Sequence, residues 1–307
     1  MNTRFTQKLS SLLICLMVAT GVAAIAVAQG QEAVALEKAL IPDDAKANAQ
    51  SKALLLQQMK ANAERAQASD SAHLWFAGFG LDSESKAFRG DVDLVQKRIS
   101  QINPNSIQYA MDNHPQSETL TRPFAHLSNI NDTLKHIGKN QREGDLALVF
   151  LTAHGNISLL ATQIGNKRYA NINDGQLATM LRSLKDMPTI IIVSACHSGS
   201  LIPALESQNR IILTAAAKGK TSYGCQPLSN NTFFVEELFG DGFDSRLSLK
   251  ANFEAALKRI KKRESEKELV PSEPQIFIGE KMKAIVEVPL NEALLPKRLA
   301  TSAAPSK

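Results

Sequence analysis

The sequence predicts an α/β fold in which helices surround a mostly parallel β-sheet. The chain has 307 residues, which is enough for one large α/β domain with tails or for two small domains. From His73 onward, short apolar runs alternate with amphipathic stretches, as expected of strands joined by helices that cross over a parallel sheet. Within the amphipathic stretches, apolar residues recur at helical spacing, so each stretch offers one apolar face to the sheet.

Five apolar runs are predicted strands. They span residues 74–79, 146–152, 189–194, 210–213 and, after a proline, 275–278. Apolar residues recur at helical spacing over residues 92–102, which predicts a helix that starts near Asp91. The same spacing covers residues 177–184, behind Asp174 as the expected N-cap.

The first 28 residues have the pattern of a signal peptide. Arg4 and Lys8 precede an apolar run over residues 12–27, and Ala26-Val27-Ala28 supplies the small residues of a cleavage site. Cleavage predicts a periplasmic or secreted protein with no membrane contact. The alternative is a protein anchored by an uncleaved N-terminal helix, because the run is close to the ~20 residues that span a bilayer.

The rest of the chain divides into three parts. Residues 29–70 are rich in Ala, Gln, Lys and Glu and predict a helical segment that acts as a prosegment or a spacer. Residues 71–285 hold the α/β pattern, and residues 286–307 are predicted to be a C-terminal tail.

Charge and cysteine content narrow the function classes. Loss of residues 1–28 lowers the formal charge from +5 to +3, because that segment carries Arg4 and Lys8 and no acidic residue. A charge this small does not predict nucleic-acid binding. Only Cys196 and Cys225 remain after cleavage, so either both are free thiols or they form a single disulfide bond.

Two chemically active residues follow two of the predicted strands. His154 comes directly after the strand at 146–152, and Cys196 follows the strand at 189–194. The carboxyl ends of parallel strands form the edge of the sheet where sites are built, so neighbouring strands would bring these residues together.

This pair of residue types is suited to nucleophilic catalysis. A thiol is mostly protonated at neutral pH, and a nearby imidazole can take its proton to give the reactive thiolate. Gly155 lets the backbone approach a substrate carbonyl, so the N–H groups of Gly155 and Cys196 are candidates for an oxyanion hole. A zinc site built from His154, Cys196 and His197 is the less favoured alternative, because no further ligands occur at the usual spacings.

The motifs resemble those of the legumain family of caspase-like cysteine peptidases. A strand ending in His154-Gly155 precedes a strand ending in Ala195-Cys196-His197-Ser198-Gly199, and the similarity covers roughly residues 72–280. The resemblance implies a caspase-like three-layer αβα sandwich over residues 71–285. It also implies a cysteine endopeptidase that acts on polypeptides through the dyad His154 and Cys196, with no metal or organic cofactor.

Further site residues are implied by the same resemblance. Thr221 and Ser222 begin the Thr-Ser-Tyr-Gly-Cys segment that is similar to the loop bordering the substrate cleft in the family. Arg89 lies where caspase-like enzymes often hold a pocket arginine. His197 departs from the pattern, because the family commonly has an acidic residue at that position.

Two other functions remain open at this stage. A transamidase of the same family would use the same thioester and release it to an amine instead of water. A catalytically silent binding module would keep the caspase-like fold without the chemistry.

Overall fold

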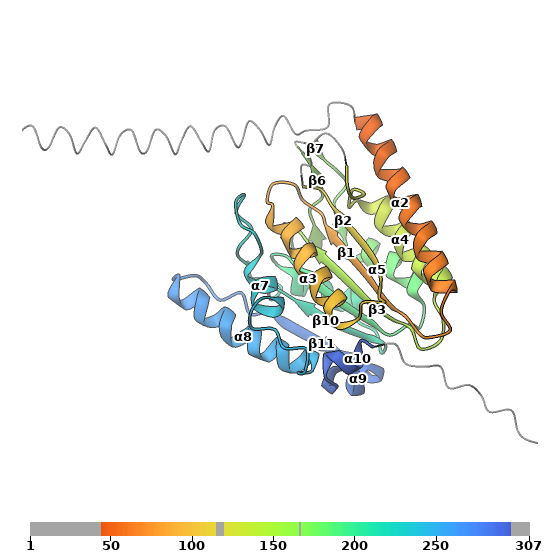
Figure 1. The fold of residues 1–307 in the computed structure, drawn as a ribbon. Coiled ribbons are helices and arrows are strands. Elements are labelled where there is room, and N and C mark those ends of the chain that lie inside the picture. The colour runs from red at the N-terminus through yellow and green to blue at the C-terminus, as the bar shows by residue number, and fades with distance from the viewer. Residues whose placement is uncertain (1–43, 115–119, 166, 296–307) are drawn as a thin grey trace, which may run out of the picture.

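The computed structural model describes residues 44–114, 120–165 and 167–295. A central sheet lies between two layers of helices, which confirms the predicted three-layer αβα sandwich (Figure 1). The predicted signal peptide lies outside the described residues. Within the described ranges, no helix is both long and apolar enough to cross a membrane.

The main sheet has six strands in the order β11-β10-β9-β3-β1-β2. The strands are β1 (Leu74–Gly80), β2 (Ile107–Asp112), β3 (Leu146–Thr152), β9 (Thr189–Ser194), β10 (Arg210–Thr214) and β11 (Gln275–Ile278). Neighbouring strands run parallel except for β11, which pairs antiparallel with β10. The sheet is therefore mostly parallel, as predicted.

Small strands lie between β3 and β9. They are β4 (Gly155–Asn156), β5 (Leu159–Leu160) and β8 (Ile172–Asn173), which form one small sheet, and β6 (Gln163–Ile164) and β7 (Lys167–Arg168), which form a hairpin. Only Ala153 and His154 separate the end of β3 from β4, so the hairpin of β4 and β5 follows the carboxyl end of β3.

Helices cover both faces of the main sheet. The α-helices are α2 (Asp44–Gln67), α3 (Ala87–Ile102), α4 (Leu127–Asn140), α5 (Asp174–Leu181), α6 (Ile202–Leu205), α7 (Phe233–Phe239), α8 (Leu249–Glu266), α9 (Lys283–Glu287) and α10 (Leu290–Ala293). The short 3-10 turns are η1 (Arg182–Leu184), η2 (Ser198–Leu201) and η3 (Glu280–Met282).

Two apolar cores result, one on each face of the sheet. Side chains from α2, α4 and α5 form one core with alternate residues of the strands, such as Val149 and Val193. Side chains from α3, α7 and α8 form the other core with the residues between them, such as Phe150 and Ile192. This alternation follows from the two-residue period of a strand.

Most of the predicted elements are confirmed, with three corrections. β2 was not predicted, because it lies at the sheet edge and its half-buried Gln108 interrupts the apolar run. The helix expected near Asp91 starts at Ala87, so Arg89 lies in its first turn. The N-cap of α5 is Asn173, whose side chain accepts the Gln176 N–H.

Helix α2 belongs to the packed fold. Leu55 is fully buried in the core that α4 and α5 share with the sheet. The Asn62 amide donates to the carbonyl of Gln108, so α2 also covers the edge strand β2. At the other end of the chain, Leu290 and Leu294 are buried in the second core, so ordered packing continues past residue 285.

The packing of α2 gives a direct test. We expect Leu55→Ala to lower the free energy of unfolding by about 2–5 kcal/mol, because it leaves a cavity in the core. Leu56→Ala is the matched control, since Leu56 is the next residue of the same helix and is 54% exposed. Its effect should stay within about 0.5 kcal/mol. Urea unfolding of both variants measures the difference, and equal losses would contradict an integral α2.

Candidate active site

The structure brings the ends of β3 and β9 side by side. Thr152 and Ser194 are register partners in the parallel ladder, and the Ala153 N–H donates to the Ser194 carbonyl over 3.1 Å. His154 and Cys196 each follow two residues after these partners, so the two predicted catalytic residues leave the same edge of the sheet together.

Gly155 lies directly against the backbone of Cys196. A Cβ added at Gly155 would lie 2.5 Å from the Cys196 carbonyl oxygen and 3.4 Å from its nitrogen, a space that only glycine leaves open. The Ala161 N–H donates to the His154 carbonyl, so the next pair of the hairpin, Gly155 with Leu160, is not hydrogen bonded. The Gly155 N–H therefore points away from its own ladder.

The chain turns sharply after Cys196. His197 has a φ of 57°, in the left-handed region that a non-glycine residue adopts at some cost, and its N–H donates to the Lys220 carbonyl. Gly199 allows the turn to approach the segment after β10, since a Cβ there would lie 2.9 Å from the Ala216 carbonyl oxygen. These contacts place Cys196 at the corner between β9 and η2.

The Cys196 thiol contacts Ser222. Its Sγ donates to the Ser222 carbonyl at 3.5 Å, and the Ser222 hydroxyl donates to Sγ at 3.8 Å. Cys196 and Cys225 are both free, so the disulfide alternative is not the form in this structure. Burial, with a smaller effect of the Cys196 charge, raises the pKa of the Cys225 thiol to about 11, so Cys225 is a neutral thiol at neutral pH.

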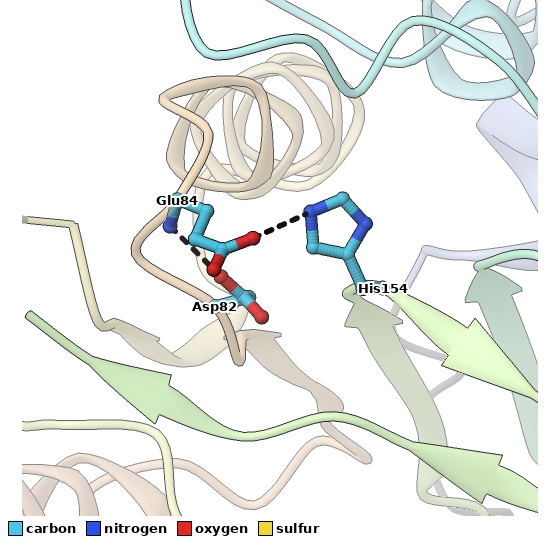
Figure 2. A group of neighbouring side chains, drawn as sticks. All are labelled: Asp82, Glu84 and His154. Atoms are coloured by element: carbon cyan, nitrogen blue, oxygen red, sulfur yellow. Dashed lines mark hydrogen bonds and ion pairs between the residues drawn. The ribbon is translucent and has the colours of Figure 1, made fainter. Parts of the chain in front are cut away.

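The His154 imidazole is held between an aromatic ring and an acidic loop. Phe88 packs edge-on against the ring, with centroids 5.1 Å apart. The Glu84 carboxylate lies 3.6 Å from Nε2, as Figure 2 shows. Asp82 is buried beside them and accepts the Glu84 N–H. Burial raises the pKa of Asp82, while that hydrogen bond and the charge of His154 lower it.

The same three residues have the donor types of a metal site. Asp82, Glu84 and His154 each offer one ligand atom, and these atoms lie within 4.8 Å of one another. Cys196 and His197 are not part of this group, which differs from the zinc alternative considered for the sequence. A metal ion bound there would occupy the His154 imidazole, which is the base of the predicted dyad.

The predicted substrate-binding residues lie in different surroundings. Ser222 contacts the Cys196 thiol, whereas Thr221 beside it is exposed. Arg89 is half-buried in α3 and lies 3.9 Å from Asp93. Burial raises the pKa of Asp112, and the charge of Arg89 offsets part of that rise. The pocket role of Arg89 and Thr221 stays a prediction.

Sequence reasoning missed Asp82 and Glu84. Both follow β1, which lies beside β3 in the sheet, so the rule that placed His154 and Cys196 at the carboxyl edge also applies to them. The available signal was the pair of acidic residues at positions 82 and 84, shortly after the strand predicted at 74–79.

Comparisons with known proteins bear on this site. A model of the Peptidase C13 family matches residues 111–284, a range that includes both His154 and Cys196. The crystal structure of caspase-1 from Spodoptera frugiperda is similar with a TM-score of 0.46 and 14% identity, over 69% of this chain and 91% of that one. No curated protein matches the chain.

The contact between Gly155 and Cys196 can be tested without a substrate. We expect Gly155→Ala to lower stability by about 1–3 kcal/mol and to change the rate at which iodoacetamide alkylates Cys196, because the new methyl group must displace the Cys196 backbone. Gly219→Ala is the control, since a Cβ there meets nothing within 4 Å. Urea unfolding and peptide mass spectrometry read the two effects. Equal behaviour of the two variants would show that the contact is not tight.

Proposed function

Because the chain belongs to the Peptidase C13 family, it is a cysteine peptidase that acts on polypeptides, and we propose that His154 and Cys196 are its catalytic dyad. The observation that carries the proposal is the contact of Gly155 with the Cys196 backbone at the shared edge of β3 and β9. That contact supports the proposal because it sets the residue after His154 against the backbone of Cys196, which carries a free thiol.

The proposed reaction begins with transfer of the Cys196 proton to the His154 imidazole. The thiolate then attacks the scissile carbonyl carbon, and the N–H groups of Gly155 and Cys196 donate to the resulting oxyanion. Collapse of this intermediate breaks the C–N bond while His154 protonates the departing amine. Water then attacks the thioester, loses a proton to His154, and releases the carboxylic acid and the free thiol.

Ser222 has two roles in this scheme. Its carbonyl accepts the hydrogen of the resting thiol, which fixes the direction of Sγ before substrate arrives. Its hydroxyl donates to Sγ and remains able to do so when the sulfur is a thiolate. Ser222 therefore lines the site next to the nucleophile, and Thr221 and Arg89 are proposed to contact the substrate farther out.

The acidic loop after β1 acts on the imidazole. When His154 carries the thiol proton, Glu84 lies within ion-pair distance of Nε2. The Glu84 side chain is 52% exposed, so the pair is screened by water and contributes no more than about 1 kcal/mol. Asp82 is buried and fixes the loop through the Glu84 N–H.

The dyad is tested by covalent labelling and turnover. We expect a peptide-based acyloxymethyl ketone to add once to the wild-type protein and not to Cys196→Ala, because the thiolate is the group that reacts. His154→Ala should lower labelling and peptide hydrolysis by at least about 10²-fold, because no base then takes the thiol proton. Intact mass and a quenched fluorescent peptide panel provide the two readouts.

Cys225→Ala is the matched control for this test. Cys225 is a second free cysteine with a neutral thiol, so its removal should leave labelling and hydrolysis unchanged. Labelling that persists in Cys196→Ala and disappears in Cys225→Ala would overturn the assignment of the nucleophile.

We also propose that the peptidase is exported. Support comes from Arg4 and Lys8 before the apolar run at 12–27 and from the small residues that end at Ala28. Expression of the whole chain in a bacterium with a periplasm should give a mature protein whose first residue is Gln29. Terminal sequencing of the periplasmic fraction checks this, and a protein that keeps residues 1–28 in the membrane fraction would favour the anchored alternative.

A further inference from the structure

A completely buried aspartate, Asp91, is hydrogen bonded to the end of β3. Asp91 belongs to α3 and has no exposed surface. An ionised carboxylate is costly to bury unless hydrogen bonds replace its water. The partners of Asp91 therefore indicate why the fold keeps a carboxylate at this position.

Four donors surround the two carboxylate oxygens. Oδ1 accepts the Thr232 N–H at 2.9 Å and the Asn231 amide at 3.2 Å. Oδ2 accepts the hydroxyls of Thr152 and Thr232, both at 2.8 Å. A carboxylate has about four acceptor positions, so the ionised side chain is fully satisfied. An amide or a protonated carboxyl has fewer acceptor positions and carries a hydrogen of its own, so at least one of the four donors would have to turn away or accept instead.

The network extends from Asp91 to both catalytic strands. Thr152 is the last residue of β3, and Thr232 is the N-cap of α7. The Thr232 hydroxyl gives its hydrogen to Asp91, so at 2.9 Å it accepts the hydrogen of the Ser194 hydroxyl, at the end of β9. Asp91 is thus hydrogen bonded directly to Thr152, which lies two residues before His154. Through Thr232 it is also connected to Ser194, which lies two residues before Cys196.

This connection lies where the ladder between the strands ends. Thr152 and Ser194 are the last register partners of β3 and β9. Beyond them, the segment after β3 enters the β4 hairpin, and the segment after β9 enters the turn at His197. The hydrogen bonds of the Thr152 and Ser194 side chains therefore hold the two strand ends aligned at the point where the backbone ladder stops. Burial raises the pKa of Asp91 to about 7 against these hydrogen bonds, so its carboxyl ionises in the neutral range.

We propose that Asp91 is a positioning residue that holds the ends of β3 and β9 in register and so sets the placement of His154 relative to Cys196. The proposal rests on the catalytic dyad proposed above. Asp91 does not reach the reacting atoms itself, because it is enclosed by Thr152, Thr232 and Asn231. Its effect on the reaction passes through the two strands.

The test compares two buried aspartates at opposite ends of β3. Asp145 is also buried and accepts three donors, the N–H groups of His73 and Arg142 and the Trp75 indole. It precedes β3 at the amino end, away from the dyad. Asp91→Asn and Asp145→Asn are made in the mature chain, confirmed to be folded by near-UV circular dichroism, and assayed for kcat, KM and alkylation of Cys196 well below their melting temperatures.

We expect both substitutions to lower the melting temperature but only one to impair the site. Asp91→Asn should lower kcat by at least about tenfold with KM within about threefold, because small displacements of the reacting groups are costly. It should also change the alkylation rate of Cys196 in the folded protein. Asp145→Asn should keep kcat within about twofold of wild type. A folded Asp91→Asn with wild-type kcat, or an equal loss of kcat in Asp145→Asn, would overturn the proposal.

Two milder variants cover the case in which Asp91→Asn does not fold. Thr152→Val removes the connection to β3, and Ser194→Ala removes the connection to β9. Each should lower kcat by about three- to tenfold, and wild-type kcat in both would overturn the proposal. Failure of the dyad itself would look different, because wild type and Cys196→Ala would then hydrolyse peptides equally.

Discussion

The parallel pairing of β3 with β9 is the constraint on which the site depends. Hydrogen bonds between these two central strands fix Thr152 opposite Ser194, and the candidate dyad follows two residues after that pair on each strand. The apolar residues before the pair are buried in both cores, so the strands cannot slide without exposing them. The geometry of the candidate site at the sheet edge is therefore fixed by the packing of side chains in the centre of the sheet.

The sequence was most informative where a short apolar run could serve only as a buried strand. β3 and β9 have the predicted bounds, because each is buried along its whole length and ends in a polar residue. The edge strand β11 also has the predicted bounds, although its residues are only half-buried or exposed. β2 was missed because an edge strand needs fewer apolar residues than a central one. The first turn of α3 was missed because its buried residues, Ala87 and Phe88, precede the periodic stretch.

For the site, local sequence was enough to select His154 and Cys196 but not their surroundings. The contacts of Ser222 and Glu84 with the dyad join segments far apart in the chain, and no short motif encodes such a meeting. Asp91 is the clearest example, because an aspartate near the start of a helix is ordinarily exposed. Only the packing of α3 and α7 against the sheet reveals that its side chain is enclosed.

Helix α2 limits how this protein could be kept inactive before use. An inhibitory segment that is discarded on maturation must leave its site without exposing the core, yet α2 contributes Leu55 and Ala66 to the interior and donates from Asn62 to the edge of the sheet. The packing of α2 therefore ties it to the body of the enzyme, as an integral helix rather than a loosely attached segment.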